Sequence, residues 1–143
     1  MTSEPETPDT RPCILILDAD VIVRHLIAEY LRTCGYRVAE AASAEEALSI
    51  LSHADVPIDT VLMDMQAPGT VNGFALLRKI RETFPDVDVV PAGSAAKATE
   101  EAADLCEEGP HLSRPYEPQM VLEEIKRLIA RRGRAVASED AAS

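Results

Sequence analysis

The sequence predicts an α/β fold in which five β-α units build a doubly wound parallel sheet. Two continuous apolar runs, 13–17 and 60–63, are each followed directly by an aspartate. A short apolar run of this kind is typical of a strand buried on both faces, as in a parallel sheet. Between the predicted strands, apolar residues recur with the period of amphipathic helices. This alternation requires right-handed crossovers, which place helices on both faces of the sheet.

The predicted elements alternate regularly along the chain. Strands are predicted at 13–17, 36–41, 60–64, 87–92 and 111–113. Helices are predicted after each strand, at about 20–34, 43–53, 73–84, 94–108 and 118–131. Asp20 and Ser94 are suitable helix N-caps, and Ser43 with Glu46 forms a capping box. The buried stripe of the third helix is predicted to be Phe74, Leu77, Ile80 and Phe84.

The length of 143 residues suggests one domain of ordinary size. Residues 1–12 hold three prolines and several acids, with no aliphatic residue after Met1. We therefore expect a disordered leader at 1–12, the folded domain at 13–131 and a flexible tail at 132–143.

Composition excludes some classes of function. The chain has 25 acidic and 14 basic residues, a formal net charge of -11, which argues against binding to a nucleic-acid backbone. There is no run of 18 apolar residues and no signal-peptide pattern, so we expect no membrane span and a cytoplasmic location. Cys13, Cys34 and Cys106 lack metal-ligand spacing and are predicted to be small buried hydrophobic residues in a reducing compartment.

Acidic residues follow two of the predicted strands. Asp18 and Asp20 follow the first strand, and Asp64 ends the third. In a flavodoxin-like (βα)5 sheet of strand order 2-1-3-4-5, these strands are neighbours at the topological switch point, so their acids converge. Clustered carboxylates raise one another's pKa unless a divalent cation neutralises them, and oxygen ligands suit Mg²⁺.

A carboxylate beside Mg²⁺ can attack a phosphoryl group, because the metal screens the negative charge of both reactants. A hydroxyl, Ser94, and a cation, Arg114, stand at the ends of the fourth and fifth predicted strands. These two side chains are suited to bind the oxygens of the phosphoryl group.

Three stretches resemble the receiver (CheY-like) domains of two-component response regulators. They are ILILDADVIVRHLIAEYLRTCGYRVAEAASAEEAL, TVLMDMQAPGTVNGFALLRKIR and LSRPYEP, and they span roughly residues 13–130. The resemblance implies that Asp64 accepts a phosphoryl group from a sensor histidine kinase or a histidine phosphotransfer protein. It also implies that Mg²⁺ is bound by Asp18, Asp64 and the backbone carbonyl of Gln66, with Ser94 and Arg114 assisting.

The chain departs from the family pattern at several of these positions. Ala19 stands at the second acid of the family's acidic pair, and Arg114 at its lysine before proline. In the family, a hydroxyl side chain moves toward the phosphoryl group and an aromatic side chain follows it. The position of this switch hydroxyl falls on Ala92, Gly93 or Ser94, and the position of the switch aromatic falls on His111. The resemblance implies a downstream protein target on the face of the fourth helix, fifth strand and fifth helix.

The leading interpretation is a single-domain receiver, not an enzyme, which signals by protein contact. A homodimer is one oligomeric state that we consider. One alternative is a degenerate receiver, an interaction module that works without phosphorylation, because a metal-ligating acid is absent at Ala19. A second alternative is a haloacid-dehalogenase-type phosphatase, with Asp18 as nucleophile and Asp20 as acid. That family needs a later lysine and a second acidic motif, which the chain does not supply at suitable positions.

Overall fold

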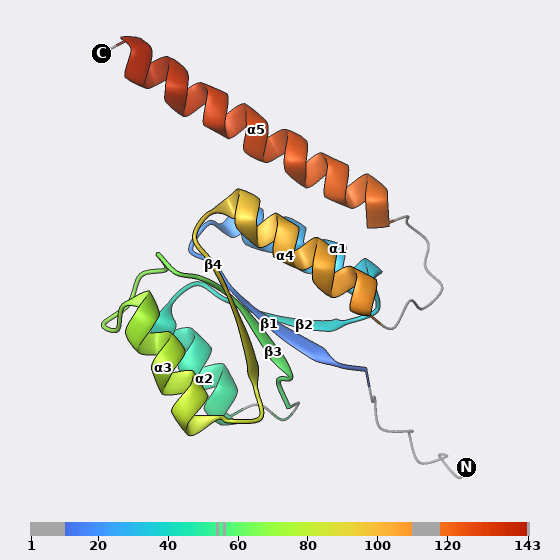
Figure 1. Cartoon of the computed structure of the whole chain (residues 1–143), viewed down its shortest axis with the longest axis vertical. Coiled ribbons are helices and arrows are strands. Elements are labelled where there is room, and N and C mark those ends of the chain that lie inside the picture. Colours follow the sequence, from blue (N-terminus) through green and yellow to red (C-terminus); the bar gives the residue numbers. More distant parts are fainter. Residues whose placement is uncertain (1–10, 54, 56, 110–117, 143) are drawn as a thin grey trace, which may run out of the picture.

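A computed structural model describes residues 11–53, 55, 57–109 and 118–142 of the chain. Its centre is a four-stranded parallel sheet with helices on both faces (Figure 1). The strands are β1 (Cys13–Leu17), β2 (Arg37–Ala41), β3 (Thr60–Asp64) and β4 (Asp88–Ala92). Their order is β2-β1-β3-β4, which confirms the predicted doubly wound arrangement. The fifth predicted strand, 111–113, lies outside the described residues.

Five helices accompany the sheet in the described part of the chain. They are α1 (Val21–Thr33), α2 (Ala44–His53), α3 (Gly73–Thr83), α4 (Ala95–Glu108) and α5 (Pro118–Ala142). Helices α2 and α3 cover one face of the sheet, whereas α1 and α4 cover the other, and α5 packs on α1 and α4 (Figure 1). Helix α5 continues to Ala142, through the segment for which the sequence predicted a flexible tail.

The strands divide the core into two clusters because successive side chains of a strand point to opposite faces. Ile14, Ile16 and Leu62 pack with α1, α4 and α5. Leu15 and Met63 pack with α2 and α3. Both faces of β1 are therefore buried, as the continuous apolar run predicted.

The buried face of α3 differs from the predicted stripe. Leu76 and Ile80 are buried and Leu77 is partly buried, but Phe74 is 74% exposed. The prediction for Phe74 was wrong because Leu76 and Ile80, four residues apart, occupy the buried face, and Phe74 lies two residues before Leu76, about 200° around the helix from it.

The cysteines correct a second prediction. All three are buried, as expected, but Cys34 and Cys106 form a disulfide with a Cα–Cα distance of 5.2 Å, whereas Cys13 lies outside it. The pair joins the C-cap of α1 to the last turns of α4, two elements separated by 72 residues in sequence. The prediction treated the two thiols as independent because such a separation carries no pairing signal.

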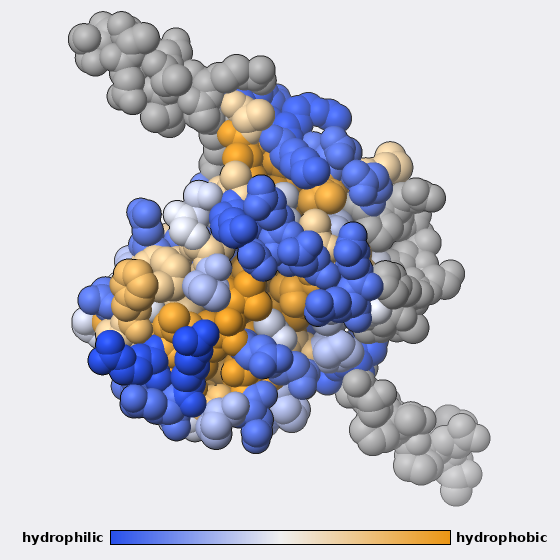
Figure 2. Space-filling model, viewed as in Figure 1, coloured by the Kyte–Doolittle hydropathy of each residue, from blue (hydrophilic) through white to orange (hydrophobic). Residues whose placement is uncertain are grey.

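The outer face of α4 is polar. Its exposed residues include Lys97, Glu100 and Asp104, and hydrophilic atoms gather over α4 in Figure 2, beside apolar surface on the same face. Within the described ranges, no helix is long and apolar enough to cross a membrane.

Candidate functional site

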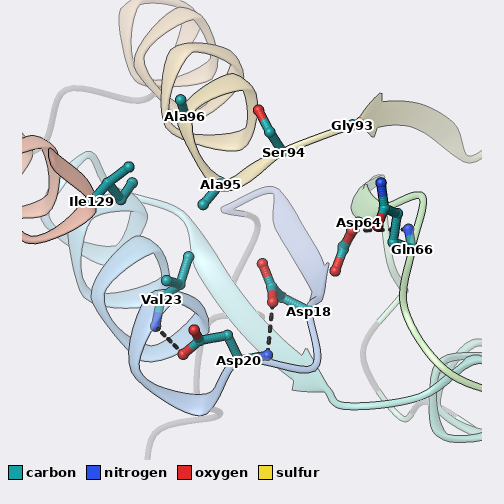
Figure 3. Close-up of a pocket in the computed structure, with 10 residues that line it drawn as sticks. All are labelled: Asp18, Asp20, Val23, Asp64, Gln66, Gly93, Ser94, Ala95, Ala96 and Ile129. Atoms are coloured by element: carbon teal, nitrogen blue, oxygen red, sulfur yellow. Dashed lines mark hydrogen bonds between the residues drawn. The ribbon is translucent and has the colours of Figure 1, made fainter. Parts of the chain in front are cut away.

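The ends of β1, β3 and β4 meet at a cavity of about 540 Å³ (Figure 3). Asp18 and Asp20 line it from the end of β1, Asp64 and Gln66 from the end of β3, and Ser94 from the start of α4. The three acids predicted to converge are thus brought to one cavity. Sequence analysis did not identify its apolar wall, to which Val23 and Ile129 contribute.

Asp18 is the most buried carboxylate of the site, with 8% of its surface exposed. Its Oδ1 accepts a hydrogen bond from the backbone N–H of Asp20 at 2.8 Å, and Arg24 donates to its carbonyl oxygen at 2.8 Å. Burial raises the pKa of Asp18, and the negative charges of Asp64 and Asp20 raise it further, against the opposing effects of the Asp20 N–H and Arg24. Negative charge is therefore crowded at this position.

Asp64 ends β3 and lies beside Ala92 in the sheet register. Its Oδ1 accepts a hydrogen bond from the backbone N–H of Gln66 at 2.9 Å. Figure 3 shows the carboxylates of Asp64 and Asp18 facing each other across the cavity. One Asp64 oxygen is thus held by the turn that follows the strand, and the other is available to the cavity.

Asp20 caps α1, as predicted. Its Oδ1 accepts hydrogen bonds from the backbone N–H groups of Ile22 at 3.0 Å and Val23 at 3.2 Å. This orientation turns the carboxylate toward the helix N-terminus (Figure 3). Asp20 lines the cavity but its charge is already used to stabilise α1.

Ser94 caps α4, where its Oγ accepts a hydrogen bond from the backbone N–H of Lys97 at 3.1 Å. Among the three candidate switch positions, Ala92 is buried within β4, Gly93 lines the cavity without a side chain, and Ser94 places a hydroxyl at its edge. Arg114 and His111 lie outside the described residues, so their predicted roles stay predictions.

The loop after Asp64 is held by α2 and α3, which sequence analysis did not anticipate. Glu45 of α2 accepts hydrogen bonds from the Thr70 backbone N–H at 2.6 Å and the Thr70 hydroxyl at 2.7 Å. These bonds lower the pKa of the Glu45 carboxyl. On the other side, a Cβ on Gly73 would lie 2.3 Å from the carbonyl oxygen of Met65. Only glycine permits this close approach.

The donor atoms of the cavity suit a hard divalent cation. Asp18 and Asp64 each have one carboxylate oxygen outside the turn hydrogen bonds, and Gln66 adds a carbonyl and an amide oxygen. Oxygen donors of this kind suit Mg²⁺, and a cation would offset the repulsion from Asp64 and Asp20 that adds to the effect of burial in raising the pKa of Asp18. The described residues hold no cluster of three or more His, Cys, Asp or Glu side chains arranged as a metal site.

Comparisons with known proteins identify the family to which this chain is similar. The family described as the response regulator receiver domain matches residues 14–137. The transcriptional regulatory protein AruR of Pseudomonas aeruginosa is 29% identical over 130 residues, which cover 89% of this chain and 53% of AruR. The phosphate regulon regulatory protein PhoB of the same organism is 28% identical over 84% of this chain and 52% of PhoB. The chain therefore spans about half the length of these relatives.

Solved structures show the same fold. A response regulator receiver domain protein from Clostridium thermocellum is 27% identical with a TM-score of 0.53, over 85% of this chain and 97% of that protein. The receiver domain of NtrX from Brucella abortus is 25% identical with a TM-score of 0.51, over 80% of this chain and 95% of that domain.

The fold and the acidic cavity define a signalling module of the two-component type. The chain belongs to the response regulator receiver domain family.

Proposed function

We propose that this receiver domain accepts a phosphoryl group on Asp64 and signals by protein contact. The observation that carries the proposal is the Asp64 carboxylate, which faces Asp18 across a cavity with the Ser94 hydroxyl at its edge. The donor is a sensor histidine kinase or a histidine phosphotransfer protein. The sensor kinase CckA of Brucella abortus contains a segment, 8% of its length, that is 35% identical to this chain over 77 residues, so domains of this type occur together with sensor kinases.

The chain's own residues perform distinct tasks in the transfer. The Gln66 N–H fixes one Asp64 oxygen, which leaves the other to form the new P–O bond while the P–N bond of phosphohistidine breaks. The imidazole nitrogen keeps the electron pair of that bond. Asp18, Asp64 and Gln66 would hold Mg²⁺, which neutralises phosphoryl oxygens when bound. Ser94 and Arg114 would donate to the phosphoryl oxygens of the product.

The remaining features of the proposal concern the protein's setting. The receiver spans 13–131, with a leader at 1–12, and acts in the cytoplasm. The segment expected to form a tail, 132–143, continues α5 as far as Ala142. Its downstream target is a protein that contacts the face of the fourth helix, the fifth predicted strand and the fifth helix. Light scattering of the purified chain distinguishes a monomer from a homodimer. The net charge of -11 argues against nucleic acid as a partner of this chain.

Intact-mass measurement after incubation with acetyl phosphate and Mg²⁺ tests the acceptor. The wild-type chain should gain one phosphoryl group, and Asp64→Asn should abolish the gain. Asp86→Asn, at an exposed position before β4, is the matched control and should retain it. A phosphoryl group that persists in Asp64→Asn but disappears in Asp18→Asn would instead indicate phosphatase-type chemistry at Asp18.

A degenerate receiver is the second candidate, favoured by Ala19. This residue is exposed at the cavity end of β1, where a carboxylate would add charge to the site. Because ligand charge sets the affinity for hard cations, Ala19→Asp should tighten Mg²⁺ binding and speed phosphorylation. A wild-type chain that takes no phosphoryl group, with an Ala19→Asp variant that does, would assign the native protein to the degenerate class.

A further inference from the structure

Helix α4 is fixed to the rest of the domain at its C-terminal end by a cluster of specific contacts. Cys106 is joined to Cys34 by the disulfide, and the Tyr36 hydroxyl donates a hydrogen bond to the carbonyl oxygen of Leu105 at 2.6 Å. Gly109 closes the cluster, since a Cβ there would lie 2.9 Å from the Tyr36 ring and 3.0 Å from the Cys34 carbonyl oxygen. The end of α4 is therefore tied to the turn between α1 and β2.

The other end of α4 belongs to the candidate site. Ser94 is its N-cap, and Ser94, Ala95 and Ala96 line the cavity beside Asp64 (Figure 3). A helix of 14 residues is about 21 Å long at 1.5 Å per residue and moves as a unit. A change in how the C-terminal end is held is thus transmitted to the edge of the cavity.

Little apolar surface holds α4 between these two ends. Its buried residues are Ala98, Thr99, Ala102 and Cys106, and Leu105 is the one large side chain that packs partly buried against the same core. Small side chains bury little area, so packing alone fixes this helix weakly. The disulfide therefore supplies a large share of the anchoring of α4.

We propose that Cys34 and Cys106 are a redox modification site whose thiol–disulfide state controls the position of α4 and thereby the reactivity of Asp64; this regulation rests on the proposed function. In the oxidised form the disulfide holds α4 and keeps Ser94 and Ala95 at the cavity. In the reduced form the C-terminal end of α4 separates from α1. Disulfides in reducing compartments are usually transient or redox-sensing, which fits a receiver that works beside cytoplasmic kinases.

The exchange partner is a low-molecular-weight disulfide in one direction and a dithiol in the other. For oxidation, the thiolate of one cysteine attacks the external disulfide and releases one external thiol. The second cysteine then attacks the mixed disulfide and releases the second external thiol. Two protein thiols thus lose two electrons and two protons, and the external disulfide is reduced to two thiols. Cys106 is the more exposed of the pair, so exchange begins there.

The first test counts thiols in the full-length wild-type chain. After equilibration with oxidised glutathione and unfolding in urea, maleimide should label only Cys13, whereas dithiothreitol treatment should give three labels. Three labels after oxidation would overturn the proposal. The Cys13→Ser chain is the matched control and should change from no label to two.

The second test measures hydrogen exchange in both redox states. Reduction should raise exchange at the amides of α4 by at least about tenfold, while the amides of α2 and α3 stay unchanged. Reoxidation should restore the protection. The Cys34→Ser/Cys106→Ser chain should match the reduced wild type under both conditions. Equal exchange of α4 in the two states of the wild type would overturn the proposal even if that variant fails to fold.

The third test links the redox site to Asp64. Reduced wild type should react with acetyl phosphate and Mg²⁺ at least about threefold more slowly than oxidised wild type, because the cavity edge is less preorganised. Equal rates would overturn the control of Asp64. Absence of phosphorylation in both states would refute the proposed function instead, and the thiol count and hydrogen exchange would still decide whether the redox site exists.

Discussion

Helices α1 and α4 lie on the same face of the sheet and both begin at the acidic cavity, but they are held in different ways. Helix α1 buries large side chains, with Ile27 and Leu31 at 0% exposure. Helix α4 buries two alanines, a threonine and Cys106, with Leu105 partly buried, and it is also held by a disulfide and one tyrosine hydrogen bond. A helix held by the burial of large apolar side chains stays in place whether cysteines are reduced or oxidised. A helix held in part by a disulfide responds when that disulfide is reduced.

The largest expected effect is the loss of the disulfide. Reduction should lower the free energy of unfolding by about 4 kcal/mol, because the bond restricts an unfolded chain across 72 residues. Urea unfolding with and without dithiothreitol measures the change. Stabilities that agree within error would show that α4 needs no disulfide, and the proposed difference between α4 and α1 would then be wrong.

Truncating a buried side chain of α1 should lower the free energy of unfolding somewhat less. Ile27→Ala removes a fully buried side chain and should destabilise the protein by about 3 kcal/mol. The same urea experiment measures it, with Phe74→Ala, 74% exposed, as a control expected to change stability by less than about 0.5 kcal/mol. The cost of Ile27→Ala should be similar in oxidised and reduced protein; a large difference would mean that the two helices are not anchored independently.

Removal of one hydrogen bond to α4, from the Tyr36 hydroxyl, tests the difference between α4 and α1 more finely. Tyr36→Phe removes the donor to the Leu105 carbonyl and should destabilise the protein by about 1 kcal/mol. Tyr30→Phe is the control, since Tyr30 is a buried tyrosine of α1 and the donor to the Leu105 carbonyl is Tyr36. Hydrogen exchange at the last turns of α4 should rise in the first variant only. Equal exchange in both variants would remove Tyr36 from the anchoring cluster.

The smallest expected effect concerns Asp18, in the cavity at which both helices begin. Because burial raises the pKa of Asp18 in the folded state, the ionised carboxylate lowers the stability at neutral pH, and stability is lost as pH rises through the folded pKa. Asp18→Asn should therefore be slightly more stable than wild type at pH 7. The gain in stability should vanish below the ordinary aspartate pKa of about 3.9, because Asp18 is then protonated in both the folded and the unfolded protein.

Thermal unfolding as a function of pH, with and without Mg²⁺, measures this prediction. Added Mg²⁺ should stabilise the wild type and stabilise Asp18→Asn less, since the amide lacks the charge that attracts the cation. An Asp18→Asn chain that is less stable than wild type at pH 7 would contradict the assigned role of burial.

The sequence was sufficient where a local signal and the global fold agree. The apolar run of β1, the cap at Asp20 and the helical period of α1 each indicate the same element, and the structure confirms it. The convergence of Asp18 and Asp64 followed from strand order, because parallel neighbours end at one edge of the sheet.

The sequence was insufficient where distant packing decides. On α3, the sequence offers both Leu76 and Phe74 for the buried face, and packing against the sheet selects Leu76 together with Ile80. The pairing of Cys34 with Cys106 depends on α4 lying against α1, a contact that no spacing of residues reveals. Arg114, outside the described residues, remains a prediction from the family resemblance.

The glycine that begins α3 also limits how this sequence can drift over evolutionary time. The first side-chain carbon of any replacement at Gly73 would lie 2.3 Å from the Met65 carbonyl oxygen, so every substitution must displace the backbone beside Asp64. Neighbouring Phe74, which is exposed, carries no such restriction. In a library of all single substitutions, position 73 should be depleted of every amino acid except glycine, whereas position 74 should accept polar and apolar residues alike.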